Sequence, residues 1–141
     1  MVKYLLDTCI VISILRGDKE IQAKVEEVGI QNCAISELTM AELYSGPYRV
    51  LYGDNDESSR IKATRQLQSL HVLKGIFEVL PWEEAGEEFA KEHERLRSKG
   101  KIIEDMDLLL AAYAIAHNMI LVTGNTKHFD RISMLKIENW Y

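Results

Sequence analysis

The stretch that decides the fold is Asp107-Leu-Leu-Leu-Ala-Ala-Tyr-Ala-Ile-Ala-His-Asn-Met-Ile-Leu-Val-Thr123. Its first part is rich in leucine and alanine, which are strong helix formers, so residues 105–117 are predicted to form a helix. Its last part, residues 119–123, is a short continuous apolar run, typical of a strand buried on both faces of a parallel sheet. A helix followed directly by such a strand is the repeating unit of an α/β fold.

The same alternation of helices and short apolar strands extends outward from this stretch. Ser36 can cap a helix that is expected to stop near Gly46-Pro47, and residues 47–57 are expected to be irregular because Gly53-Asp-Asn-Asp favours a turn. The predicted strands are 2–6, 33–35, 76–80, 119–123 and 136–138, and the predicted helices are 8–15, 18–28, 36–46, 58–71, 83–99, 105–117 and 125–129. We therefore expect an α/β fold with a parallel central sheet, formed by residues 1–141 as one domain.

The composition is ordinary for a globular protein and excludes some kinds of partner. Of the 141 residues 47% are hydrophobic, which suffices for a core, and no apolar run approaches the roughly 20 residues of a membrane span. The start of the chain does not resemble a signal peptide, so a cytoplasmic location without a membrane partner is expected. The net charge of −5 argues against tight binding of nucleic acid by charge alone, although bound divalent cations would reverse the local sign.

Acidic side chains follow the predicted strands. Asp7 comes directly after the first strand, Glu42 lies in the helix after the second, and Asp107 lies at the start of the apolar helix. In parallel sheets, ligands bind beyond the carboxyl ends of the strands, where these side chains are expected to gather. Asn125 and Thr123 end the next strand at the same edge. Oxygen ligands without a Cys–His set favour Mg²⁺ or Mn²⁺ over Zn²⁺.

Each acid also has a structural interpretation. Asp7 can be a simple helix cap, and Glu42 can be a solvated helix residue. Asp107 is the most informative, because its helical neighbours Leu110, Ala111 and Ala114 are apolar and mostly small. A carboxylate on such an inward face is unfavourable unless it is paired or binds a metal. Asp105 lies on another face, where it can cap the helix or interact with its positive end.

Other reactive residue types carry weaker signals. Cys9 and Cys33 lack metal-binding spacing and are expected to be buried, reduced thiols. The four histidines show no ligand spacing, and none is given a catalytic role, although His128 lies near the expected site. The basic stretches 60–65 and 95–101 are typical of solvated faces, and the second leads towards Asp107, where it can supply phosphate contacts.

Four motifs occur in a fixed order along nearly the whole chain. They are Tyr4-Leu-Leu-Asp7-Thr8, Ser36-Glu-Leu-Thr-Met-Ala-Glu42-Leu43, Ile103-Glu-Asp-Met-Asp107-Leu-Leu-Leu-Ala-Ala-Tyr-Ala114 and Leu121-Val-Thr-Gly-Asn125-Thr-Lys-His-Phe129, followed by Glu138-Asn-Trp140. Together they resemble the motifs of the PIN-domain family, and within it the VapC-type toxins of prokaryotic toxin–antitoxin pairs. The resemblance implies a three-layer α/β/α domain around a central parallel sheet.

The resemblance also implies a mechanism and a site. Asp7, Glu42 and Asp107 would hold Mg²⁺, with Mn²⁺ as a substitute, for hydrolysis of RNA phosphodiester bonds. Asn125 stands where many family members have a fourth acid, which leaves one-metal and two-metal schemes open, and Asp105 is a secondary candidate ligand. Thr8 and Thr123 would support the site. The implied partners are an RNA substrate, a cognate antitoxin that covers the acidic pocket, and a second copy of the chain in a homodimer.

Three alternatives remain open from the sequence. The first is a non-catalytic PIN-like module that binds RNA or a protein. The second is a receiver or flavodoxin-like domain, which is disfavoured because Asp7 lacks an adjacent acid. The third is an RNA-processing nuclease of the same family without an antitoxin. If the metal hypothesis is right, the three carboxylates repel one another without metal, and Asp7→Asn or Asp107→Asn is expected to raise the melting temperature.

Overall fold

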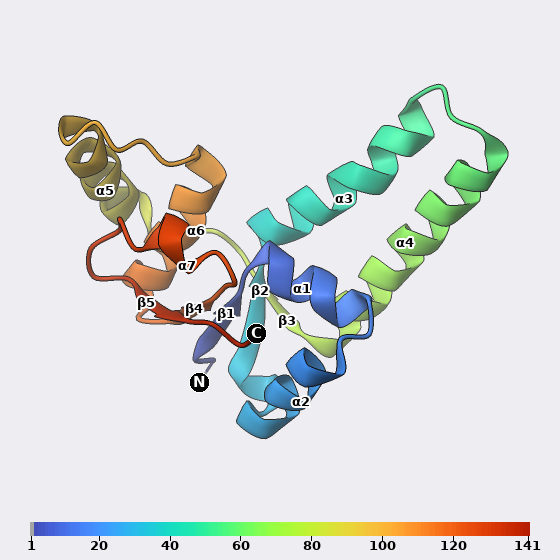
Figure 1. Cartoon of the computed structure of the whole chain (residues 1–141), viewed down its shortest axis with the longest axis horizontal. Helices are drawn as coiled ribbons and strands as arrows, with labels where there is room; N and C mark the ends of the chain where they lie inside the picture. The colour runs from blue at the N-terminus through green and yellow to red at the C-terminus, as the bar shows by residue number, and fades with distance from the viewer. Residues whose placement is uncertain (1) are drawn as a thin grey trace.

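The computed structural model describes residues 2–141 and contains a five-stranded sheet flanked by helices (Figure 1). The strands are β1 (Tyr4–Leu6), β2 (Cys33–Ser36), β3 (Glu78–Leu80), β4 (Ile120–Val122) and β5 (Lys136–Glu138). The helices are α1 (Thr8–Leu15), α2 (Lys19–Val28), the short 3-10 helix η1 (Ile30–Asn32), α3 (Glu37–Tyr52), α4 (Glu57–Ile76), α5 (Gly86–Ser98), α6 (Asp105–Ala116) and α7 (Thr126–Phe129). None of the helices described is long and apolar enough to cross a membrane.

All strand pairs in the sheet are parallel, and the strand order is β3-β2-β1-β4-β5. Tyr4 pairs with Cys33 on one side and with Ile120 on the other, so β1 lies in the centre. From β1 the chain proceeds outward through β2 to β3, and from β4 it proceeds outward to β5 in the opposite direction. The crevice at the carboxyl ends of β1 and β4 is therefore the switch point where α/β proteins bind ligands.

Two apolar cores cover the two faces of the sheet. Leu5 belongs to the core beneath α5, α6 and α7, whereas its neighbour Leu6 belongs to the core beneath α1, α2, α3 and α4. Successive residues of a strand point to opposite faces, so β1 contributes to both cores. Both leucines are fully buried, a contribution of about 1.5–3 kcal/mol each. The three-layer α/β/α fold with a parallel sheet is thus confirmed.

The long helical pair α3–α4 departs from the sequence prediction. Helix α3 does not stop at Gly46-Pro47 but continues to Tyr52, so the prediction of an irregular segment at residues 47–57 is wrong for most of its length. Proline inside a helix costs about 3 kcal/mol, because it lacks the N–H for the preceding turn. Here Pro47 is buried, and α3 packs along α4 as a helical hairpin (Figure 1), which favours continuation of the helix.

The end of α4 is also later than predicted. The helix continues to Ile76, and the N–H of Phe77 still bonds to the carbonyl of Leu73 at 3.0 Å, so β3 begins only at Glu78. The predicted cap at Ser36 is present, since its Oγ accepts a hydrogen bond from the N–H of Leu38 at 3.1 Å. This cap begins α3 directly at the carboxyl end of β2 and so directs the helix that carries Glu42 away from the sheet edge.

Candidate functional site

Asp7 lies at the carboxyl end of β1, next to the end of β4. Its Oδ1 accepts a hydrogen bond of 2.8 Å from the N–H of Thr8, so Asp7 caps α1 as the sequence allowed. Its Oδ2 accepts a 2.7 Å hydrogen bond from the hydroxyl of Thr123, which is fully buried after β4. Both oxygens of Asp7 are therefore oriented by donors from two adjacent strand ends.

Glu42 extends from α3 towards the same strand ends. The hydroxyl of Thr8 donates a hydrogen bond of 3.2 Å to its Oε1. The pKa of Glu42 is raised, first because burial penalises the charged form, and further because of the negative charges of Asp107, Asp7 and Glu104; the bond from Thr8 opposes this rise. Glu42 is thus close enough to these acids to experience their charge.

Asp107 occupies the first turn of α6, and its side chain is 28% exposed. Its helical neighbours Leu110, Ala111 and Ala114 are buried, as the sequence pattern predicted. Burial raises the pKa of Asp107, the adjacent His128 lowers it, and the charges of acidic neighbours raise it again, so the net change is a rise. Acidic side chains from α3, from the end of β1 and from α6, which are far apart in the sequence, therefore lie close to one another at this edge of the sheet.

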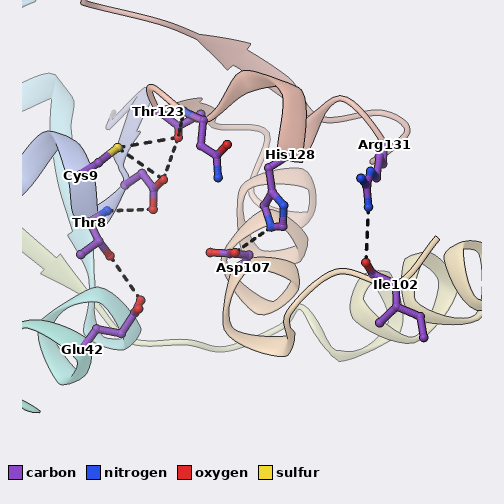
Figure 2. A network of polar contacts seen from close by, with 10 residues as sticks. Thr8, Cys9, Glu42, Ile102, Asp107, Thr123, His128 and Arg131 are labelled. Carbon is purple, nitrogen blue, oxygen red and sulfur yellow. Dashed lines mark hydrogen bonds and ion pairs between the residues drawn. The ribbon is translucent and has the colours of Figure 1, made fainter.

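Figure 2 shows the arrangement of the labelled side chains. Glu42 and Asp107 point from α3 and α6 into a common region beside Thr8 and Thr123. No Lys or Arg within residues 2–141 forms an ion pair with Asp7, Glu42 or Asp107. The region is therefore rich in acidic side chains, and no Lys or Arg of the described residues neutralises them.

The fit of a metal ion to this region can be judged from its donor chemistry. Three carboxylates, two of them with raised pKa, are the hard oxygen donors that Mg²⁺ and Mn²⁺ prefer. Across residues 2–141, however, no three His, Cys, Asp or Glu side chains are gathered into a closed set of metal ligands. The residues fit the ion in chemistry and charge, and the closed ligand set stays a prediction.

The secondary candidates lie at the border of the site. Asn125 precedes α7, and its N–H donates a 3.0 Å hydrogen bond to the hydroxyl of Thr123, but its side chain makes no capping bond. Asp105 is exposed at the start of α6, where its negative charge interacts favourably with the positive end of the helix dipole. Of the two roles considered for Asp105, the cap is not observed, because Glu104 occupies the cap position, also without a side-chain hydrogen bond.

Two further residues, which were not predicted to do so, contact the acids. Nε2 of His128, on α7, lies 2.8 Å from Oδ2 of Asp107, so the ring can donate a hydrogen bond to this carboxylate (Figure 2). The Sγ of Cys9 lies 3.8 Å from Oδ2 of Asp7, and Cys9 is only partly buried, in contrast to the prediction. Cys33 is buried as expected, and burial raises the pKa of its thiol to about 11. The only indication in the sequence that His128 contacts the site was its position shortly after the end of β4.

Comparison with known proteins places this chain in a family. The model of the PIN domain matches residues 4–134. Ribonuclease VapC2 of Haemophilus influenzae (strain ATCC 51907 / DSM 11121 / KW20 / Rd) is 30% identical over 99% of both chains, and Ribonuclease VapC2 of Rickettsia felis is 33% identical over 97% of both.

A solved structure supports the same relationship. VapBC2 from Rickettsia felis, bound to a DNA fragment from their promoter, contains a chain with 29% sequence identity and a TM-score of 0.84, with 100% of both chains covered. This chain therefore belongs to the PIN-domain family. Within that family, its similarity extends over the full length of proteins named as VapC ribonucleases.

Proposed function

We propose that this chain is a divalent-metal-dependent endoribonuclease that hydrolyses RNA phosphodiester bonds, and that it is the toxin of a type II toxin–antitoxin pair. The observation that carries the proposal is the meeting of Glu42 and Asp107, both with raised pKa, beside Asp7 at the switch point of the sheet. Clustered carboxylates without a paired Lys or Arg side chain are unfavourable unless they serve to bind a cation. The ribonuclease names of the full-length relatives support the RNA substrate.

In this mechanism Asp7, Glu42 and Asp107 would hold Mg²⁺ or Mn²⁺. When bound, such an ion would supply Lewis acidity for the activation of water and for the stabilisation of the negative charge that develops on the phosphoryl oxygens. Thr123 and the N–H of Thr8 hold both oxygens of Asp7 in place, and the hydroxyl of Thr8 orients Glu42. Such outer hydrogen bonds fix ligand geometry before the substrate arrives.

The protein partners are proposed on separate grounds. Solved relatives are VapBC complexes, which supports a cognate antitoxin for this chain. An antitoxin would cover the negative site with an Arg or Lys side chain, since a cation complements clustered carboxylates. We also propose a homodimer. The α3–α4 hairpin offers a surface for it, because it projects from the sheet and exposes Tyr48 and Tyr52 (Figure 1).

The function is tested by incubating the purified protein with total cellular RNA in chelator and in Mg²⁺. We expect cleavage only with Mg²⁺, and products without a 2′,3′-cyclic phosphate, because water is the nucleophile. Cleavage that is equally fast in chelator would exclude metal dependence, and RNA binding without cleavage would favour the non-catalytic module.

The toxin role needs a growth assay in cells. Expression of the wild type should stop growth, whereas co-expression of the product of the adjacent gene should restore it. Cleavage of RNA in the test tube without any effect on growth would instead favour an RNA-processing nuclease without an antitoxin.

A further inference from the structure

One flank of the site joins two segments that are far apart in the sequence. The loop between α5 and α6 contains Ile102, whose carbonyl accepts a hydrogen bond of 3.5 Å from Nη1 of Arg131, just beyond α7. The carbonyl of Arg131 in turn accepts a bond of 2.6 Å from Nη2 of Arg95 on α5. Figure 2 shows Asp107, His128 and Arg131 following one another outward from the site. Arg131 and the loop that contains Ile102 therefore lie on the same side of Asp107 as His128.

The exposed charged side chains of this flank include four cations, alongside the acids Glu104, Asp105 and Asp130. Lys101 directly precedes Ile102, and Lys127 directly precedes His128, the residue that contacts Asp107. Lys99, Lys101, Lys127 and Arg131 are all exposed, and none of them forms an ion pair within residues 2–141. By contrast, the α5 residues Arg95 and Arg97 are neutralised by acids on their own helix. We call Lys99, Lys101, Lys127 and Arg131 the basic flank.

We infer that the basic flank binds the phosphates of the RNA strand next to the bond that is cleaved, an inference that rests on the proposed function. Clustered carboxylates repel a polyanion, and a protein with a net charge of −5 has no general attraction to offset this. Unpaired cations beside the site offset the repulsion locally. Arg131 is suited to this role because its guanidinium can bind phosphate in a forked geometry.

The chain offers a matched control for this surface. Lys62 and Arg65 on α4 and Lys19 on α2 are exposed and belong to the helices on the other side of the sheet from α5 (Figure 1). Replacing these three by alanine removes the same charge as replacing Lys101, Lys127 and Arg131. Any difference in RNA binding between the two triple variants therefore results from where the cations lie on the surface, and not from the net charge.

The experiment measures anisotropy of a fluorescent 30-nucleotide RNA of randomised sequence, in chelator, over a series of NaCl concentrations. Each phosphate contact on a single strand contributes about 0.7 to the slope of log K against log salt, so the flank variant should lose about 2 from the slope. The control variant should keep the wild-type slope. Equal melting temperatures of the three proteins would show that both variants fold.

Each outcome decides the inference. The inference would be overturned if the slope of log K against log salt decreased equally in both variants, or if it did not decrease in the flank variant. It would also be overturned if the wild type showed no salt-dependent binding. Equal competition by a polyglutamate peptide would overturn it too, since the flank would then bind acidic protein instead of RNA. A separate cleavage assay distinguishes the two proposals. If the wild type cleaves RNA but the flank variant binds normally, only the flank inference fails. If nothing is cleaved but the flank variant binds poorly, only the nuclease proposal fails.

Discussion

Asp107→Asn is expected to stabilise the protein when divalent metal is absent. Burial and the charges of Asp7 and Glu104 raise the pKa of Asp107 more than His128 lowers it. A carboxyl whose folded pKa is raised favours folding fully below its ordinary pKa of 3.8, and that contribution is lost as the pH rises through the folded value. At neutral pH the ionised Asp107 therefore opposes folding, and a neutral amide of the same shape removes this cost.

The size of the gain follows from two opposing effects. Relief of strain at a functional site is commonly worth about 0.5–2 kcal/mol. The amide still pairs with the ring of His128, but it loses about 1 kcal/mol of the charge-assisted part of that 2.8 Å contact. The upper part of the first range exceeds this loss, so we expect a net gain of up to about 1 kcal/mol. For 141 residues, at about 2.1 cal/mol/K of unfolding entropy per residue, this corresponds to a rise of up to about 3 °C in melting temperature.

The assay is thermal unfolding in chelator at pH 7 and pH 5, with Asp105→Asn as the control. Asp105 lies in the same first turn of α6 but is exposed, so its loss removes the same charge and a similar helix-dipole interaction without relieving the site. Asp107→Asn should melt above wild type, and Asp105→Asn should not. The difference in melting temperature between Asp107→Asn and the wild type should be smaller at pH 5, because Asp107 of the wild type is then more often protonated.

Added Mn²⁺ gives the complementary result. At a hundred times its dissociation constant, an ion that binds only the folded state stabilises it by about 2.7 kcal/mol. The wild type and Asp105→Asn should gain this stability, and Asp107→Asn should gain far less. If Asp107→Asn melts below both other proteins in chelator, and Mn²⁺ shifts all three equally, the reasoning about the site is refuted.

Three further outcomes are expected. His128→Ala should slow RNA cleavage by about 10–100-fold through loss of carboxylate orientation, with RNA binding unchanged, whereas His117→Ala, which alters a ring hydrogen-bonded outside the site, should cleave near the wild-type rate. Thr123→Val should destabilise by about 1–3 kcal/mol in urea unfolding, because the hydroxyl bound to Asp7 is lost. Thr39→Val should be neutral or stabilising by the same measurement, because the equally buried hydroxyl of Thr39 has no hydrogen-bond partner within residues 2–141; a loss as large as at Thr123 would contradict this account.

The layers of the fold could be predicted from local patterns. A continuous apolar run such as Ile120–Val122 identifies a buried parallel strand, and caps such as Ser36 depend only on nearby residues. The course of α3 through Pro47 could not be predicted in this way. The helix continues where α4 packs along it, and that contact joins segments far apart in the sequence. Tertiary packing overrode the local signal here.

The candidate site was predictable in residue type but not in its hydrogen bonds. The inward face of Asp107 followed from helical periodicity, and Leu110 and Ala111 are indeed buried. The contact of His128 with Asp107 spans 21 residues and depends on how α7 sits beside α6, which no spacing rule contains. Asp7 also differs from Asp107 in a way the sequence did not show. Donors from Thr8 and Thr123 satisfy its oxygens, so we no longer expect Asp7→Asn to raise the melting temperature.

The most direct test of the central claim is the rate of RNA cleavage in Mg²⁺ by wild type, Asp107→Asn and Asp105→Asn, measured side by side with a chelator control. Both variants replace a carboxylate by an amide, at two positions that lie two residues apart on one helix. We predict that cleavage requires Mg²⁺, is abolished in Asp107→Asn and is largely retained in Asp105→Asn. Cleavage by Asp107→Asn at the wild-type rate would contradict the claim that this carboxylate holds the catalytic metal.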